Sequence, residues 1–246
     1  MDTPFSLRGK HVLVTGASSG MGRIFAQMIA RQGGRTTLLA RNTERLEQTR
    51  SQLEGEGHQM IVCDLTVEAQ LKDAIAQIEP LDGIVLCAGV NEFVPVKFVK
   101  QEKIDRIFQT NYFSQLLLVQ MLLKKKLVQK GASIVFISSV SSVMGVPGTL
   151  LYASSKGAIN SAVRVLASEL AGQQIRVNAI LPGIVRTEML SGTNIDEEIF
   201  TKQESQYPLG LGTPEDVGYA VLYHLSEASR WLTGQCMVID GGLTLS

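Results

Sequence analysis

The stretch HVLVTGASSGMG, residues 11–22, joins a short apolar run to a loop with three glycines. The apolar run is rich in valine and leucine and ends at a turn residue, as a buried β-strand does. Gly16, Gly20 and Gly22 follow, and a segment of helical length begins around them. Glycine permits a sharp turn and close approach to a pyrophosphate, and a helix N-terminus offers free N–H groups. The stretch therefore favours a dinucleotide-binding loop, although its G-x-x-x-G-x-G spacing differs from the commoner G-x-G-x-x-G.

The rest of the chain repeats this alternation of short apolar runs and longer amphipathic segments. The runs that read as strands are HVLVTG, RTTLLA, QMIVCD, GIVLCAG, SIVFISS, IRVNAILPG and MVIDGG. The segments of helical length between them include 20–32, 43–55, 67–78, 101–129 and 151–171. Strands that are apolar on both faces indicate a mostly parallel sheet covered on both sides. Right-handed crossovers then predict an α/β fold of the doubly wound, Rossmann type with about seven strands.

Composition suits one globular domain with a sizeable core. Of the 246 residues, 45% are hydrophobic and 19% are charged, and no repeat or linker divides the chain. We therefore predict a single domain over residues 1–246. Lys+Arg 23 balances Asp+Glu 23, so nothing indicates a nucleic acid or an anionic membrane as partner. No segment offers the roughly 18 apolar residues that a membrane helix needs.

Three cysteines and three histidines are scattered along the chain. An odd, widely spaced set of cysteines in apolar runs predicts reduced thiols in a cytoplasmic protein, without a disulfide framework. The isolated histidines and cysteines predict no metal site.

The segment 186–212 interrupts the alternation. It is polar, carries three glycines and follows the C-terminal end of a strand. Ligands of open α/β sheets bind at that edge, and long irregular insertions there are often lids. We predict a substrate lid, with a solvent loop and short helix as the alternative. Helical order resumes at Thr213-Pro214-Glu215-Asp216, a sequence typical of a capped helix start.

LLYASSKGA, residues 150–158, places Tyr152 and Lys156 four residues apart. On a helix both side chains project from one face. Tyrosine and lysine at this spacing are also common as a surface pair. Lowering a tyrosine pKa from about 10 to about 7 requires roughly 4 kcal/mol. An ammonium about 5 Å away, at an effective dielectric of about 20, supplies roughly 3 kcal/mol. We therefore expect Lys156 to lower the pKa of Tyr152, making the pair a candidate acid–base centre.

Several motifs carry a resemblance to a known family. They are TGASSGMG at 15–22, Asn111, Ser139, the pair Tyr152 and Lys156, and LPGIVRT at 181–187. In this order and spacing they resemble the short-chain dehydrogenase/reductase family, in its compact single-domain branch. Ser139 precedes Tyr152 by thirteen residues, as the family's serine does, and the resemblance runs from about residue 8 to 242.

The resemblance implies a role for each of four catalytic residues. Tyr152 would exchange a proton with a substrate oxygen, and Ser139 would hold that oxygen by a hydrogen bond. Lys156 would also bind the nicotinamide ribose. Asn111, a poor interior residue for its helix, resembles the family asparagine that positions a water linking Lys156 to solvent. The alternative for Asn111 is that it only caps or bends the helix.

The resemblance also implies a set of cofactor-binding residues. Asp64 would hold the adenine edge, Gly89 would lie against the adenosine ribose, and Thr187 would meet the nicotinamide carboxamide. The whole set is Gly16, Ser18, Gly20, Met21, Gly22, Arg41, Asp64, Leu65, Ala88, Gly89, Tyr152, Lys156, Pro182, Gly183, Val185 and Thr187. One departure is clear, because the family commonly has Asn-Asn-Ala-Gly where residues 86–89 are Leu-Cys-Ala-Gly. Any bracing by an asparagine side chain is therefore lost or replaced.

Arg41 directly follows the second predicted strand, which ends at Ala40. A NAD-preferring site usually places an acid there, on the ribose hydroxyls. An acid would repel a 2′-phosphate, whereas a guanidinium can bond it and stack on the adenine. We therefore predict NADP(H) as the cofactor. The alternative is that Arg41 is an ordinary solvated residue.

Together these residues predict an NADP(H)-dependent oxidoreductase acting on a small-molecule carbonyl or secondary alcohol. The resemblance is closest to bacterial 3-oxoacyl-thioester reductases. Carrier-protein reductases, however, often have a basic residue where this chain has Ser168. Sugar, polyol and steroid dehydrogenases are alternatives, and a non-catalytic redox sensor is the alternative from another class. A pure binder need not keep Ser139, Tyr152 and Lys156 together.

The helices at 101–129 and 151–171 carry more apolar surface than one sheet face needs. Gly157, Ala158 and Ser161 would allow another helix to come close. By resemblance, these helices pair across a two-fold axis, commonly in a homotetramer, with a dimer as the alternative.

Overall fold

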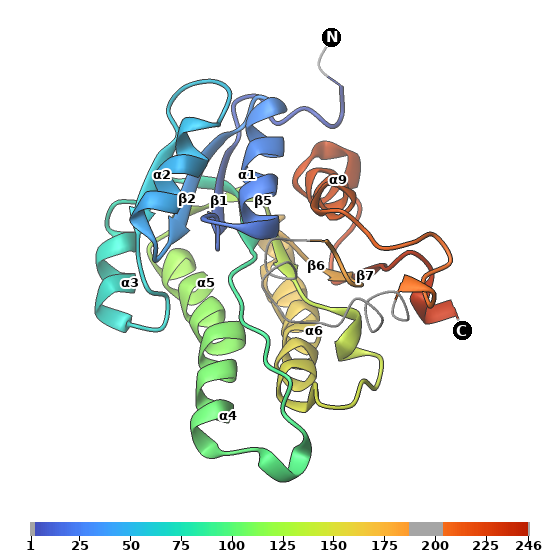
Figure 1. The fold of residues 1–246 in the computed structure, drawn as a ribbon. Coiled ribbons are helices and arrows are strands. Elements are labelled where there is room, and N and C mark those ends of the chain that lie inside the picture. The colour runs from blue at the N-terminus through green and yellow to red at the C-terminus, as the bar shows by residue number, and fades with distance from the viewer. Residues whose placement is uncertain (1–2, 187–203, 246) are drawn as a thin grey trace.

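A parallel sheet forms the centre of the computed structural model, with helices on both of its faces (Figure 1). The structure describes residues 3–186 and 204–245. Seven strands run in the order β3-β2-β1-β4-β5-β6-β7, and every neighbouring pair is parallel. Their bounds are β1 His11–Thr15, β2 Arg35–Ala40, β3 Gln59–Val62, β4 Leu81–Leu86, β5 Val128–Ile137, β6 Arg176–Pro182 and β7 Cys236–Ile239. The predicted doubly wound fold is confirmed.

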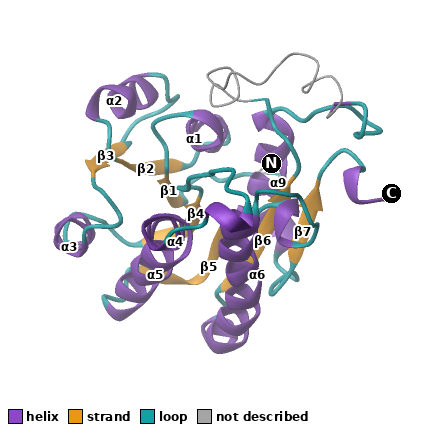
Figure 2. Ribbon diagram, turned by 60° about the horizontal axis from the view of Figure 1, so that its bottom comes forward, coloured by secondary structure: helices purple, strands orange, loops and turns teal. Residues whose placement is uncertain are grey.

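The helices divide between the two faces of the sheet (Figure 2). The bounds of the α-helices are α1 Gly20–Arg31, α2 Thr43–Ser51, α3 Glu68–Ile75, α4 Gln101–Phe108, α5 Ser114–Lys124, α6 Leu150–Leu170 and α9 Pro214–Leu225. Buried side chains of α1, α2 and α9 share one core cluster, and those of α3, α5 and α6 share the other. In β1, Leu13 joins the second cluster, whereas Val12 and Val14 join the first. Both faces of the strand are therefore covered, as its continuous apolar sequence predicts.

The helical segment predicted over 101–129 is present from Gln101 to Lys124, but it is not one regular α-helix and its predicted end is wrong. A π-helical turn, Gln109–Phe113, separates α4 from α5, and residues 128–129 already belong to β5. The chain leaves α5 through Lys126, whose φ of 57° is left-handed. Such a helix end is usually marked by glycine, and a lysine there gave no signal in the sequence.

Helix α9 begins with the cap that the sequence predicts. The Thr213 hydroxyl accepts a hydrogen bond from the Asp216 N–H, while the Asp216 carboxylate accepts one from the Thr213 N–H at 2.7 Å. Pro214 is the first helical residue. Among residues 3–186 and 204–245, no helix has the length and apolar character needed to cross a bilayer.

All seven strands point the same way, so their carboxyl ends meet at one edge of the sheet. β1 lies between β2 and β4 in the sheet, and the chain passes from β1 to β2 in one direction and from β3 to β4 in the other. Open α/β sheets bind ligands outside the carboxyl ends of their strands, at the point where the strand order reverses in this way. The loops after β1 to β6 carry many of the predicted site residues to this edge, while Tyr152 and Lys156 lie on α6.

Candidate active site

The loop between β1 and α1 folds back onto the first turn of the helix. Gly16 has a left-handed φ of 68°, and a Cβ at Gly22 would overlap the Gly16 carbonyl oxygen. The Arg23 guanidinium donates a hydrogen bond to the Ser18 carbonyl at 2.8 Å, which holds the middle of the loop. A tight loop without side chains at these positions, next to a helix N-terminus, fits a pyrophosphate.

The end of β1 is tied to the loop after β4. The Thr15 hydroxyl accepts hydrogen bonds from the backbone N–H groups of Cys87, at 3.0 Å, and Ala88, at 3.1 Å. A Cβ on Gly16 would lie 3.0 Å from the Ala88 backbone. The glycine loop and the Cys87–Gly89 segment therefore lie side by side at this edge of the sheet.

Tyr152 and Lys156 lie on α6, and Ser139 follows β5 directly. The Lys156 Nζ atom is 5.7 Å from the centroid of the Tyr152 ring and donates a hydrogen bond to the Ile137 carbonyl at 2.7 Å. The Ser139 hydroxyl interacts with the Tyr152 phenol and accepts a hydrogen bond from the Ser141 N–H at 3.2 Å. The structure thus brings the three predicted catalytic residues together.

The expectation that Lys156 lowers the pKa of Tyr152 is wrong for this structure. Burial raises the pKa of Tyr152, and the interaction with Ser139 opposes that rise only in part. Burial also lowers the pKa of Lys156 to about 8. Removal of both groups from water disfavours their charged forms, and this effect outweighs the attraction used in the prediction. Tyr152 is therefore protonated at neutral pH, as a proton donor must be.

Asn111 lies in the π-helical turn between α4 and α5 and is fully buried. Its Oδ1 atom accepts from the Val90 N–H at 2.8 Å, and its Nδ2 donates to the Val90 carbonyl at 2.9 Å and to the Ser155 hydroxyl at 3.1 Å. A Cβ on Gly89 would lie 3.3 Å from the Asn111 Oδ1 and 3.6 Å from the Lys156 Nζ. Gly89, Asn111 and Lys156 thus converge, and the helix irregularity suggested as the alternative is also present.

Arg41 and Asp64 lie beside each other, beyond the ends of β2 and β3. The Arg41 side chain is 70% exposed, and its guanidinium lies 3.7 Å from an Asp64 carboxylate oxygen. The other Asp64 oxygen accepts hydrogen bonds from the N–H and the hydroxyl of Thr66. Burial acts to raise the pKa of Asp64, but Thr66 and Arg41 together hold it below its ordinary value. Leu65, in contrast, is buried in the core.

Pro182 ends β6, and the loop after it brings Gly183 and Val185 to the same edge of the sheet. The Gly183 N–H donates to the Ile239 carbonyl at 2.9 Å, and Val185 forms an isolated parallel bridge with Gly212. Val185 is almost fully buried, and Met21 is partly buried against the same core cluster. The predicted contact of Thr187 and most of the predicted lid, 186–212, lie outside the described residues.

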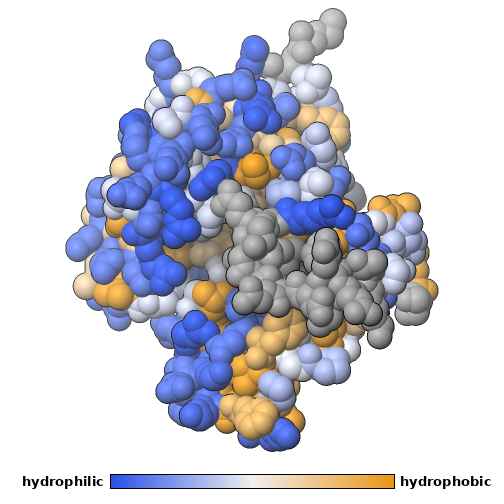
Figure 3. Space-filling view, in the orientation of Figure 1, coloured by the Kyte–Doolittle hydropathy of each residue, from blue (hydrophilic) through white to orange (hydrophobic). Residues whose placement is uncertain are grey.

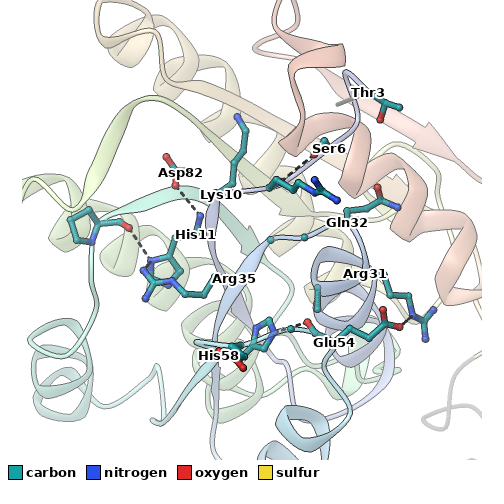
Figure 4. A pocket seen from close by; sticks show the side chains of 18 residues that line it. Thr3, Ser6, Lys10, His11, Arg31, Gln32, Arg35, Glu54, His58 and Asp82 are labelled. Carbon is teal, nitrogen blue, oxygen red and sulfur yellow. Dashed lines mark hydrogen bonds and ion pairs between the residues drawn. The ribbon is translucent and has the colours of Figure 1, made fainter. Parts of the chain in front are cut away.

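A separate hollow of about 830 Å³ opens at the opposite, amino-terminal edge of the sheet (Figure 4). Its charged groups pair with neighbouring residues, as Arg31 does with Glu54 and Arg35 with Glu79. The His11 Nε2 atom is 2.8 Å from the Thr37 hydroxyl. The hollow contains none of the predicted catalytic residues. Within the described part of the chain, no group of three or more metal-binding side chains is placed to hold an ion.

Comparison with known proteins shows the family to which this chain belongs. The family model described as Enoyl-(Acyl carrier protein) reductase matches residues 16–244. The chain belongs to the short-chain dehydrogenase/reductase family. Carbonyl reductase family member 4 from Danio rerio is 34% identical, over 95% of this chain and 97% of its own length. The 3-oxoacyl-(acyl-carrier-protein) reductase FabG from Rickettsia bellii (strain RML369-C) is 31% identical, over 97% and 98%. A solved structure, a short-chain type dehydrogenase/reductase from Mycobacterium marinum, is 31% identical with a TM-score of 0.89 and covers 98% of both chains.

As a short-chain dehydrogenase/reductase, the protein is an oxidoreductase, and its family uses nicotinamide dinucleotide cofactors. The sequence prediction missed two residues that support the site. The Ser138 hydroxyl lies 3.1 Å from the Lys156 carbonyl oxygen and 2.8 Å from the Asn160 Oδ1, and the Asn160 Nδ2 donates to the Ser142 hydroxyl. These bonds fasten the end of β5 to α6. Asn160 offered a signal, because it is a second asparagine inside a helix.

Proposed function

We propose that the protein is an NADP(H)-dependent oxidoreductase that interconverts a carbonyl compound and a secondary alcohol. The observation that carries this proposal is the convergence of Ser139, Tyr152 and Lys156 beside the glycine loop. A bound nicotinamide would supply or accept the hydride. Side chains of this protein would donate the proton and hold the substrate oxygen.

In the reducing direction, the protonated Tyr152 phenol donates its proton to the substrate oxygen. Ser139 sits next to the phenol, so its hydroxyl can hydrogen-bond the same oxygen while negative charge develops there. Lys156, fixed to the Ile137 carbonyl, places an ammonium behind the phenol below a pH of about 8. That charge stabilises the tyrosinate left after proton transfer.

Preference for NADP(H) is supported by Arg41. The guanidinium is largely exposed, and its Asp64 partner is also bound to Thr66. A 2′-phosphate could therefore take up the remaining guanidinium N–H donors. One charge-assisted hydrogen bond is worth about 1.5–3 kcal/mol, so we expect a preference for NADPH over NADH of roughly tenfold to a hundredfold.

For the substrate, we propose a 3-oxoacyl thioester or a related ketone. The support is the 3-oxoacyl-(acyl-carrier-protein) reductase among the relatives and the carbonyl reductase beside it. Ser168 is exposed on α6 where a basic residue would favour an acyl carrier, so we favour a free or coenzyme-linked acyl group over a carrier-bound one. The lid over 186–212 and the cytoplasmic location stay predictions.

A panel of ketones and alcohols, followed by nicotinamide absorbance, tests the proposal. It should contain a 3-oxoacyl thioester, a polyol, a sugar acid and a steroid ketone, each with NADPH and NADH or their oxidised forms. We expect the largest kcat/KM for the thioester with NADPH. Cofactor binding without turnover of any member would favour a redox sensor instead.

A further inference from the structure

The segment Cys87–Val90 lacks the asparagine that the family commonly carries before its Ala-Gly pair. Its backbone is nevertheless held on several sides. Thr15 accepts from the Cys87 and Ala88 N–H groups, and Asn111 bonds both the N–H and the carbonyl of Val90. Neither Thr15 nor Asn111 donates to the Ala88 carbonyl, which lies in the middle of the segment.

Gln115 supplies that donor from α5. It lies one helical turn after Asn111, its side chain is 0% exposed, and its Nε2 donates a hydrogen bond to the Ala88 carbonyl. Only the amide nitrogen can donate, so this contact sets the orientation of the carboxamide. Among the described residues, the Gln115 Oε1 atom has no hydrogen-bond partner.

An unpaired buried acceptor is costly, and few folded proteins keep one without a reason. An apolar residue at position 115 would avoid that cost but would leave the Ala88 carbonyl without its side-chain donor. Cys87 cannot take over the contact, because a thiol is a weak donor. The fold therefore keeps a carboxamide whose oxygen is unpaired among the described residues, while its nitrogen holds the Ala88 carbonyl.

The position of that carbonyl matters on both sides of the segment. Ala88 packs against Gly16 of the glycine loop, and the next residue, Gly89, faces Asn111 and Lys156. A shift of a few tenths of an ångström at Ala88 would change its contact with Gly16 on one side and move Gly89 relative to Lys156 on the other. The segment thus couples the cofactor loop to the catalytic lysine.

We propose that Gln115 is a positioning residue for the cofactor-binding segment Cys87–Val90, replacing the bracing that an asparagine in this segment would provide. This inference rests on the proposed use of a nicotinamide dinucleotide. Gln115 does not touch the substrate. It acts through the Ala88 backbone, and its loss should loosen the segment and weaken cofactor binding more than it slows the chemical step.

Gln115→Met tests the proposal, because methionine has nearly the same length and no amide. Gln120→Met is the matched control, since Gln120 is an exposed residue of the same helix. Two quantities are measured: amide hydrogen exchange of residues 87–90 in the cofactor-free protein, and NADPH dissociation by fluorescence titration. We expect exchange in the segment to accelerate, and the dissociation constant to rise, by about three- to tenfold in Gln115→Met, the size expected for one lost hydrogen bond. kcat at saturating cofactor should stay within about twofold, and Gln120→Met should match the unmodified protein.

Unchanged exchange at residues 87–90 in Gln115→Met overturns the proposal, as does a lower kcat with an unaltered cofactor KM. If Gln115→Met does not fold, Gln115→Asn serves instead, because it keeps the polar group but is one methylene too short to reach Ala88. The same loosening is then expected, and its absence is equally decisive. Should the unmodified protein bind neither NADPH nor NADH, the proposed function fails while the exchange measurement still tests the bracing.

Discussion

At the scale of single residues, burial shifts the pKa values of two titrating groups of the candidate active site in opposite directions. It raises the pKa of the Tyr152 phenol and lowers that of the Lys156 ammonium. In both cases the neutral form is favoured, because the charged form loses its hydration. The consequences for proton transfer and for pH dependence can be measured separately.

Tyr152→Phe should abolish turnover without affecting the cofactor site. Phenylalanine keeps the ring but has no proton to exchange, and general acid catalysis is typically worth about a hundredfold to ten-thousandfold. We expect kcat to fall by at least about a hundredfold, with NADPH affinity within about twofold. Steady-state rates alongside cofactor fluorescence measure both. Turnover near that of the unmodified protein would exclude Tyr152 as the proton donor.

Activity in the reducing direction should decline as the pH rises through about 8. Lys156 is charged below its pKa of about 8 and neutral above it, while the raised pKa of Tyr152 keeps the phenol protonated across this range. The profile of kcat/KM reports groups of the free enzyme. The guanidinium of a Lys156→Arg variant stays charged over this range. The remaining activity of that variant should therefore not decline as the pH rises through about 8. A flat profile to pH 9.5 in the unmodified protein would contradict the assignment.

The same shift affects stability. The folded-state pKa of Lys156 is lowered, so between pH of about 8 and the unfolded value of 10.5 the unfolded chain binds more protons. The Lys156 contribution to the free energy of unfolding therefore increases as the pH rises through that window.

Arg41→Asp should erase or invert the preference for NADPH. The aspartate would repel a 2′-phosphate and also face Asp64, which lies 3.7 Å from the present guanidinium. The rate with saturating NADH should be largely unchanged, because Arg41 is remote from the proton-transfer residues. The ratio of kcat/KM for the two cofactors is the measurement. A preference of the unmodified protein for NADH would show that Arg41 has no phosphate to bind.

At the scale of elements, the loop between β1 and α1 needs glycine at positions where a side chain would clash with the backbone. Gly22→Ala would place a methyl group against the Gly16 carbonyl oxygen. That oxygen is a backbone atom, so the clash can be relieved only by moving the loop. Gly131→Ala is a useful control, because Gly131 lies in β5 with a left-handed φ of 83° and open space around its Cα.

We expect Gly131→Ala to lower the free energy of unfolding by about 1–2 kcal/mol through left-handed strain alone, with normal cofactor affinity. Gly22→Ala should lower it by about 1–3 kcal/mol and also weaken NADPH binding at least about tenfold, because the loop must move. Urea unfolding and fluorescence titration separate the two effects. Native-like affinity in Gly22→Ala would mean that this loop does not hold the pyrophosphate.

At the scale of the whole molecule, apolar side chains remain uncovered along α6 and the π-helical turn. Phe113 is 49% exposed and Val165 is 57% exposed, and a Cβ on Gly157 would meet nothing within 4 Å. Hydrophobic residues also reach the surface at the lower end of the molecule, beside the hydrophilic flank of α4 (Figure 3). A second copy of the chain would cover such a surface.

Light scattering at micromolar concentration should give a mass of two or four times 26.7 kDa. Gly157→Arg should shift the mass toward the monomer, because the arginine has room within one chain but not between two packed helices. Gln48→Arg, on the exposed side of α2, should leave the assembly intact. A monomeric mass for the unmodified protein would refute the predicted tetramer and dimer alike.

The sequence by itself determined the seven strands, the doubly wound order and the helix that carries Tyr152 and Lys156. These follow from apolar periodicity, turn residues and spacing along one helix face, all of which are local or nearly so. The family motifs then predicted Ser139 and Asn111 as their partners.

Tertiary structure alone decided how these groups behave. The pKa of Tyr152 moves upward rather than downward because desolvation depends on every segment packed around the phenol, not on one lysine four residues away. Lys126, just after α5, has a left-handed φ that its residue type does not predict. The contact of Gln115 with Ala88 joins positions 27 residues apart, and nothing in either local sequence marks it. Such pairings depend on how α5 packs against the end of β4, and that packing exists only once the sheet has formed.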